Sequence, residues 1–223
     1  MGNGLTELVF ILDCSGSMNG YEADTVGGFN SVLKKQRKAG SEALVTTILF
    51  NHETKILHDR IGINDVEKMT LEDYPVSGCT ALLDAVGDTI DHIKNIHKYI
   101  RKEDVPEHTL FVITTDGLEN ASYKYTASKV RKAIAQQKEL GWEFLFLAAD
   151  LDAEAAAEHI GISRNKAANF HKDSKGIKKA FDAVASACSS IPPCGAVADN
   201  WKKKLNEDFY GRVKEPASEF SED

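Results

Sequence analysis

Hydrophobic positions along the chain follow two periodicities, one typical of strands and one typical of helices. Short β-branched and aromatic runs predict strands, and apolar residues spaced three to four apart predict helices. Residues 7–12 form such a run, whereas Leu83, Val86, Ile90 and Ile93 trace a helical stripe. The expected strands cover 7–12, 43–50, 55–61, 110–114, 142–148 and 168–171, and the expected helices cover 22–38, 80–100, 125–140, 153–160 and 176–189.

The order of these elements predicts the fold class. Strands that alternate with helices form a parallel sheet that is covered by helices on both faces. Only a short Asn-His-Glu turn separates the strands expected at 43–50 and 55–61, which indicates a hairpin. We therefore expect a three-layer α/β/α fold, with a mostly parallel central sheet and one antiparallel edge strand.

One domain is expected over residues 1–190, followed by a C-terminal tail over 191–223. The segment Ile191-Pro-Pro-Cys breaks the alternation, and the residues after it include too few large apolar side chains for a second core. Trp201 and Phe209 can still pack against the domain. We expect disorder for the last part of the tail.

Composition narrows the classes of function. The formal net charge is -7, which argues against nucleic acid as a partner, since binding to phosphate backbones requires a cationic surface. The apolar runs are far shorter than the roughly 18 to 20 residues of a membrane span. The first residues lack the features of a secretion signal, and the four cysteines lack paired C-x-x-C spacing. We therefore expect a cytoplasmic protein with reduced thiols and no membrane partner.

Polar residues that could carry chemistry lie where expected strands end. Asp13, Ser15 and Ser17 directly follow the first strand, and open α/β sheets bind ligands at the carboxyl ends of their strands. By itself this group could equally be a polar turn or a helix cap. Thr80 begins the long helix, however, and Asp116 follows another buried strand. Three loops thus offer oxygen atoms at one edge of the sheet.

These residue types favour a hard metal ion. If the strands before Asp13 and Asp116 are neighbours, their ends lie about 4.8 Å apart, close enough for both carboxylates to share one cation. Two carboxylates and three hydroxyls, without a clustered His or Cys pair, suit Mg²⁺ or Mn²⁺ better than zinc. Mg²⁺ is therefore the expected ion, with Mn²⁺ as the substitute.

The segments around these residues resemble a known site. They read Ile11-Leu-Asp13-Cys-Ser15-Gly-Ser17-Met18, Gly78-Cys-Thr80-Ala-Leu-Leu-Asp84-Ala and Ile113-Thr-Thr-Asp116-Gly117. In this order they resemble the three loops of the metal-ion-dependent adhesion site of von Willebrand factor type A (vWA) domains. The resemblance covers about residues 5–190, shows no departure from the five-position motif, and implies a Rossmann-like sheet.

The resemblance also implies a role for each of the five residues. Ser15, Ser17 and Thr80 would coordinate the ion directly, and Asp13 and Asp116 would hold or neutralise it. An Asp or Glu of a partner protein would complete the coordination. The leading residues and the lack of a secretion signal resemble bacterial stand-alone cytoplasmic members of the family.

Three functions are compatible with these residues. The first is a Mg²⁺-dependent protein-binding module that is not an enzyme. The second is a Mg²⁺-dependent phosphoryl-transfer enzyme with an aspartyl nucleophile, but such enzymes resemble D-x-D-x-[TV], and Ser15 stands at the second Asp. The third is a regulatory scaffold that recognises partners through helices or the tail, which the complete five-residue motif disfavours. Asp84 either supports the site or stabilises the helix dipole.

Overall fold

Six strands form one sheet in the computed structural model, which describes residues 4–191 and 197–213. The strand order is β3-β2-β1-β4-β5-β6, and every neighbouring pair is parallel except β2 and β3. This arrangement confirms the expected fold class, including the antiparallel edge strand β3. The strands are β1 (Thr6–Asp13), β2 (Ala43–Phe50), β3 (Thr54–Gly62), β4 (His108–Thr115), β5 (Trp142–Ala148) and β6 (Ala167–Asn169).

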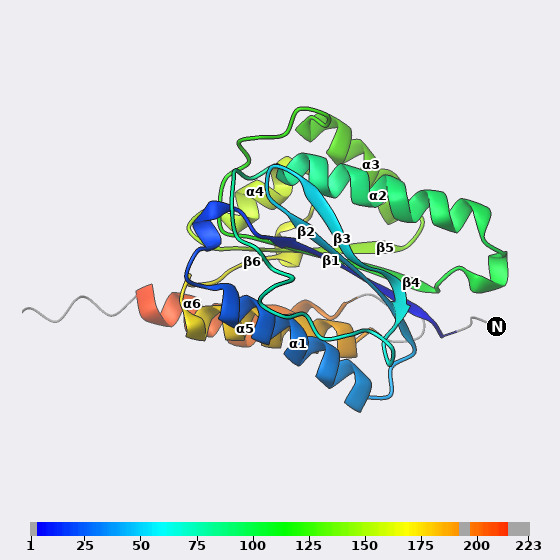
Figure 1. Cartoon of the computed structure of the whole chain (residues 1–223), viewed down its shortest axis with the longest axis horizontal. Helices are drawn as coiled ribbons and strands as arrows, with labels where there is room; N and C mark the ends of the chain where they lie inside the picture. The colour runs from blue at the N-terminus through cyan, green and yellow to red at the C-terminus, as the bar shows by residue number, and fades with distance from the viewer. Residues whose placement is uncertain (1–3, 192–196, 214–223) are drawn as a thin grey trace, which may run out of the picture.

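Helices cover both faces of this sheet. Figure 1 shows α1, α5 and α6 on one face and α2, α3 and α4 on the other. The helices are α1 (Glu22–Lys38), α2 (Leu82–Tyr99), α3 (Ala127–Glu139), α4 (Ala153–His159), α5 (Ser174–Ser189) and α6 (Lys203–Val213). Of the helices described, none has both the length and the apolar character needed to cross a membrane.

The sheet separates two hydrophobic cores. Successive residues of a strand point to opposite faces, so Leu8 and Phe10 join the core beneath α1 and α5, while Val9 and Ile11 join the core beneath α2 and α3. On the first face, Phe10 meets Phe29 of α1 edge-on, with ring centroids 5.2 Å apart. Burial on both faces explains why the central strands are almost continuously apolar.

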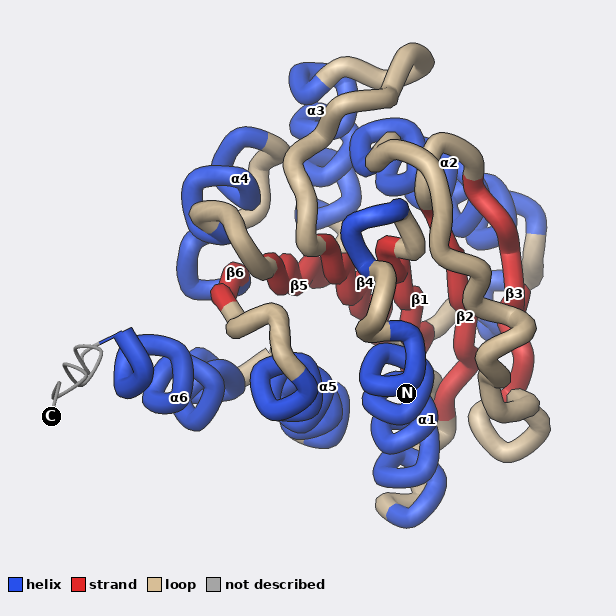
Figure 2. Tube along the Cα trace, turned by 60° about the vertical axis from the view of Figure 1, so that its left-hand side comes forward, coloured by secondary structure: helices blue, strands red, loops and turns tan. Residues whose placement is uncertain are grey.

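The described part of the segment 191–223 packs on the domain. Trp201 and Leu205 are buried in the same core as α5, and Trp201 Nε1 donates a hydrogen bond to the carbonyl of Asn165 at 3.0 Å. Figure 2 shows α6 beside α5. Residues 214–223, which contain the part expected to be disordered, lie outside the described residues. The division of the chain at residue 190 stays a prediction.

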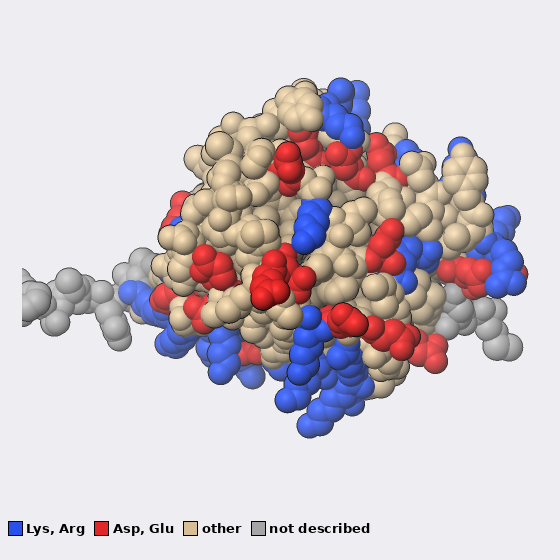
Figure 3. All heavy atoms as spheres, viewed as in Figure 1, with Lys and Arg blue, Asp and Glu red and all other residues tan. Residues whose placement is uncertain are grey.

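The described surface carries both signs of charge. On the face shown in Figure 3, Lys and Arg side chains gather along the lower side, where α1 and α5 lie, and Asp and Glu are spread more widely. Lys35 of α1 pairs with Asp182 of α5 across this region, at 2.5 Å. Such exposed pairs add little stability, so packing rather than surface charge holds these helices to the sheet.

Strand order places the candidate residues together. β1 and β4 are parallel neighbours in the middle of the sheet, with Leu12 opposite Thr114. Asp13 and Thr115, the last residues of the two strands, therefore lie at the same edge. The loops after β1, before α2 and after β4 meet there.

Candidate metal centre

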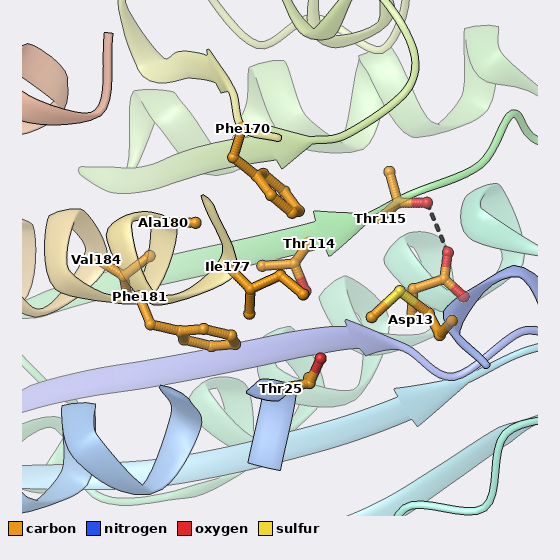
Figure 4. Close-up of a pocket in the computed structure, with 10 residues that line it drawn as sticks. Asp13, Thr25, Thr114, Thr115, Phe170, Ile177, Ala180, Phe181 and Val184 are labelled. Atoms are coloured by element: carbon orange, nitrogen blue, oxygen red, sulfur yellow. Dashed lines mark hydrogen bonds between the residues drawn. The ribbon is translucent and has the colours of Figure 1, made fainter. Parts of the chain in front are cut away.

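The carboxylate of Asp13 joins the ends of β1 and β4. Its Oδ1 accepts a hydrogen bond from the backbone N–H of Ser15 at 2.8 Å, and its Oδ2 accepts one from the hydroxyl of Thr115 at 2.6 Å. Figure 4 shows the second bond beside an apolar pocket, which Phe170 and Ile177 help to line. Thr115 was not among the residues predicted from the sequence. It fixes the orientation of Asp13.

Ser15, Ser17 and Asp116 form a continuous line of oxygen atoms. The hydroxyl of Ser17, in the short 3-10 turn η1 (Gly16–Met18), donates a hydrogen bond to Asp116 Oδ1 at 2.6 Å. The hydroxyl oxygens of Ser15 and Ser17 are 3.1 Å apart. The loops after β1 and after β4 are therefore connected through side chains that could be metal ligands.

Thr80 contributes from the third loop. A methyl group on Gly117 would lie 3.4 Å from Thr80 Oγ1 and 3.6 Å from Ser17 Oγ, so both hydroxyls face Gly117. Thr80 is buried, as are Asp13, Ser15 and Asp116. All five predicted residues thus lie around one point at the carboxyl edge of the sheet. Their role as metal ligands stays a prediction.

Asp84 holds the loop that follows Asp116. Its carboxylate accepts hydrogen bonds from the backbone N–H groups of Tyr123, Lys124 and Tyr125, at distances between 2.7 and 3.3 Å. Asp84 is buried in the first turn of α2, where a negative charge also suits the helix dipole. The structure therefore gives a basis for both roles considered for Asp84, support of the site and stabilisation of the helix dipole. Its hydrogen bonds hold the loop after Asp116 and do not reach the candidate ligands themselves.

Burial shapes the electrostatics of the site. Burial raises the pKa of Asp13, while hydrogen bonds from Thr115 and Ser15 oppose this rise and the negative charge of Asp116 adds to it. Ionising the buried Asp13 carboxylate is therefore costly. A cation bound beside Asp13 would lower that cost.

The sequence did not reveal Lys172. This residue lies between β6 and α5, and its Nζ is 2.8 Å from Asp116 Oδ2. The buried Oδ2 receives no hydrogen bond of ordinary geometry from the described residues, so its contact with Lys172 is an ion pair. No spacing rule connects position 172 with the three motif segments, because the contact depends on where β6 lies in the sheet.

The donor set fits a hard divalent ion. It consists of two carboxylates and three hydroxyls, the oxygen ligands that Mg²⁺ and Mn²⁺ prefer. Among residues 4–191 and 197–213, no cluster of three or more His, Cys, Asp or Glu side chains is arranged to hold a metal. Any ion at this edge of the sheet would therefore depend on the hydroxyls of Ser15, Ser17 and Thr80.

Solved structures with the same architecture settle the fold. The vWF domain of the type V pili tip protein Mfa5 from Porphyromonas gingivalis superposes with a TM-score of 0.61 at 12% identity, over 87% of this chain and 98% of that one. A von Willebrand factor type A structure from Catenulispora acidiphila gives 0.56 at 12% identity, over 82% and 42%. The chain has a vWA fold.

A third vWA-like structure carries a metal. Proximal thread matrix protein 1 from the mussel byssus, with a zinc-occupied MIDAS motif, has a TM-score of 0.56 at 11% identity, over 83% of this chain and 46% of that one. This chain thus spans less than half the length of the thread matrix protein. Comparison with protein-family models found no match, and neither did a search of curated proteins.

Proposed function

We propose that this chain is a divalent-metal-dependent protein-binding module. Asp13, Ser15, Ser17, Thr80 and Asp116 would hold Mg²⁺, or Mn²⁺ in its place, and an Asp or Glu of the partner would complete the coordination. The observation that carries the proposal is the position of the Ser17 and Thr80 hydroxyls on either side of Gly117, next to the Ser17–Asp116 hydrogen bond. The metal in the thread matrix protein supports a divalent ion in general.

The neutral and the charged residues of the site have different roles. When bound, the ion supplies a positive charge that coordinates a carboxylate. Ser15, Ser17 and Thr80 are neutral donors, so Asp13 and Asp116 are the protein carboxylates that offset the ion. Because the charges of these two carboxylates only equal the charge of the ion, the ion can still attract an external anion. The neighbouring loops 19–24, 72–77 and 118–123 would select among partners that offer a carboxylate.

We propose binding rather than turnover. A phosphoryl-transfer enzyme with an aspartyl nucleophile needs a nearby acid that protonates the leaving group. The position where phosphoryl-transfer enzymes carry an acid holds Ser15. A phosphomonoester assay with Mg²⁺ present should give no hydrolysis above background.

Calorimetry with Mg²⁺ and Mn²⁺ tests the metal centre directly. We expect one ion per chain, and failure to bind either ion at millimolar concentration would overturn the proposal. A Ser17→Ala variant should bind the ion more weakly, while Ser186→Ala, in the second half of α5 and remote from the site, should behave like the natural protein.

The partner is tested by chelation and by charge removal. Binding should require Mg²⁺ or Mn²⁺ and disappear with a chelator. Replacing one partner Asp or Glu by Asn or Gln should cost about 2 to 5 kcal/mol of binding free energy, since it removes a charged contact. A partner that binds equally well in chelator would place recognition on the helices or on the segment after residue 190. We also propose a cytoplasmic location, which fractionation of the source cell tests.

A further inference from the structure

A lysine ammonium lies at the edge of the metal centre, surrounded by residues from several loops. Lys172 Nζ is 2.8 Å from Asp116 Oδ2 and 3.6 Å from Asp150 Oδ2, and it lies 5.6 Å from the centre of the Tyr21 ring. The Asp116 side chain is fully buried, whereas the Lys172 side chain is 19% exposed. The ammonium group therefore lies between a buried candidate ligand and the solvent.

Neighbouring contacts hold this lysine in place. His171 Nε2 is 3.1 Å from the carbonyl oxygen of Phe209, and the two rings stack with centroids 4.7 Å apart. On the other side, Asp173 Oδ1 caps α5 by accepting the N–H of Gly176 at 2.6 Å. A methyl group on Gly176 would lie only 2.0 Å from the carbonyl oxygen of His171. Both residues that flank Lys172 are thus anchored, and the backbone that carries it is packed closely against α5.

The charge of Lys172 changes the balance of the site. Asp13, Asp116 and Lys172 together carry one net negative charge when all three are ionised. With a divalent ion bound, these three residues and the ion would carry one net positive charge. Without Lys172, the net charge would be zero. Lys172 therefore repels the ion that the two carboxylates attract, and it strengthens the attraction for an external anion.

Lys172 also has donors left for such an anion. An ammonium group has three N–H donors, and Asp116 Oδ2 is its nearest carboxylate oxygen. Asp150 Oδ2, at 3.6 Å, is beyond ordinary hydrogen-bond distance, and the Asp150 side chain is 62% exposed. A carboxylate that arrives from the solvent could therefore meet the ammonium group while it coordinates the ion.

We propose that Lys172 is a second cation of the metal centre, which weakens the binding of the metal ion and binds the partner's carboxylate beside it. The inference rests on the proposed function, because it assumes that Asp116 is a metal ligand. It assigns two opposite effects to one side chain, and a purely structural lysine would not produce both.

The first measurement is calorimetric titration of the full chain with MnCl₂ at about pH 8, where carboxylates are ionised. Lys172→Met should bind Mn²⁺ roughly tenfold more tightly, the size expected from removing a unit charge a few ångströms from a double charge in a water-like medium. Lys172→Arg keeps the charge and should bind like the natural protein. Lys175→Met is the matched control, since Lys175 pairs with Asp208, which is not a residue of the site.

The second measurement uses acetate as the carboxylate probe. Acetate is added to the Mn²⁺-saturated protein, and its binding is followed by water-proton relaxation, which reports water displaced from Mn²⁺. Lys172→Met should bind acetate about tenfold more weakly or worse, because the charge-assisted hydrogen bond is lost. Lys172→Arg should retain acetate binding, and Lys175→Met should not differ from the natural protein.

The outcomes separate the two proposals. If the natural protein takes up no Mn²⁺, the proposed function is wrong and this inference is overturned with it. If the natural protein binds Mn²⁺ but Lys172→Met binds it no more tightly, or binds acetate equally well, only the role of Lys172 is wrong. Thermal unfolding of each variant checks the fold, and Lys172→Gln replaces the Met variant if that variant does not fold.

Discussion

Thr80 and Asn120 are joined by a reciprocal pair of hydrogen bonds. The backbone N–H of Thr80 donates to Asn120 Oδ1 at 2.9 Å, and the backbone N–H of Asn120 donates to the carbonyl of Thr80 at 3.0 Å. This pair connects the loop before α2 with the loop after β4, and so keeps the Thr80 hydroxyl beside Gly117. The position of one candidate ligand therefore depends on a residue that is not itself a candidate ligand.

Asn120→Ala should weaken both the fold and the metal centre. The variant removes the acceptor for the N–H of Thr80, and an unsatisfied buried donor costs about 1 to 3 kcal/mol. Metal affinity should fall by roughly 10-fold to 100-fold, as it does when groups that orient ligands are removed. Urea unfolding and titration with Mn²⁺ measure the two effects. Asn95→Ala, at an exposed position of α2, is the control: it should leave metal affinity unchanged and should not destabilise the fold, since Ala favours a helix.

Asp13→Asn should abolish metal binding without lowering stability in metal-free buffer. The amide can still accept from the N–H of Ser15 and can donate to the Thr115 hydroxyl, which can in turn donate to the carbonyl of Gly117. The substitution removes a carboxylate whose pKa is raised by burial. A clear loss of thermal stability would mean that the ionised carboxylate serves the fold.

The stability difference between Asp13→Asn and the natural protein should depend on pH. A carboxyl group with a raised pKa in the folded state lowers stability as pH rises from the unfolded value through the folded one. The advantage of the Asn variant should therefore be absent in strong acid, grow as pH rises past the ordinary pKa of Asp, and level off above the raised pKa. Denaturant unfolding at several pH values, with a chelator present, follows this difference. The reverse slope would contradict the raised pKa.

Gly78→Ala and Gly27→Ala should have opposite effects on stability. Gly78 has a φ of +73°, and a methyl group there would lie 2.2 Å from His52 Nδ1, so the variant should lose about 1 to 2 kcal/mol. Gly27 lies within α1, where an added methyl group would meet no atom of another element within 4 Å, so the variant should gain about 0.5 to 1 kcal/mol. Thermal or urea unfolding measures both changes. Equal effects at the two positions would argue against the left-handed backbone at Gly78.

Glu7→Gln should lower the stability of the protein without changing its affinity for the metal ion. Glu7 is fully buried near the start of β1, far along the strand from Asp13, and it pairs with Arg60 at 2.8 Å and His97 at 2.5 Å. Removing the charge leaves Arg60 without its partner, which should cost about 3 to 5 kcal/mol of unfolding free energy. Calorimetry should find unchanged Mn²⁺ affinity in the folded variant. A changed affinity would connect this ion pair to the metal centre.

The secondary structure could be predicted because its signals are local. The strand expected at 43–50 matches β2, and the helix expected at 22–38 matches α1. Helix α6 was not predicted. Trp201 and Leu205, which anchor this region, find their apolar partners only after β6 and α5 have formed, so their short segment shows little periodicity of its own.

The candidate metal site, like the secondary structure, could be predicted only in part. The sequence by itself determined the alternation of strands and helices and the five oxygen-bearing residues, because each motif segment spans only a few positions at the end of one element. Only the tertiary structure decided which groups hold those residues: Thr115 on Asp13, Asn120 on Thr80 and Lys172 on Asp116. These contacts join loops that are distant in sequence, and they depend on β1 lying beside β4 and on β6 lying two strands from β4. Periodicity within a segment has no information about that order, because it is set by how the helices and strands pack as a whole.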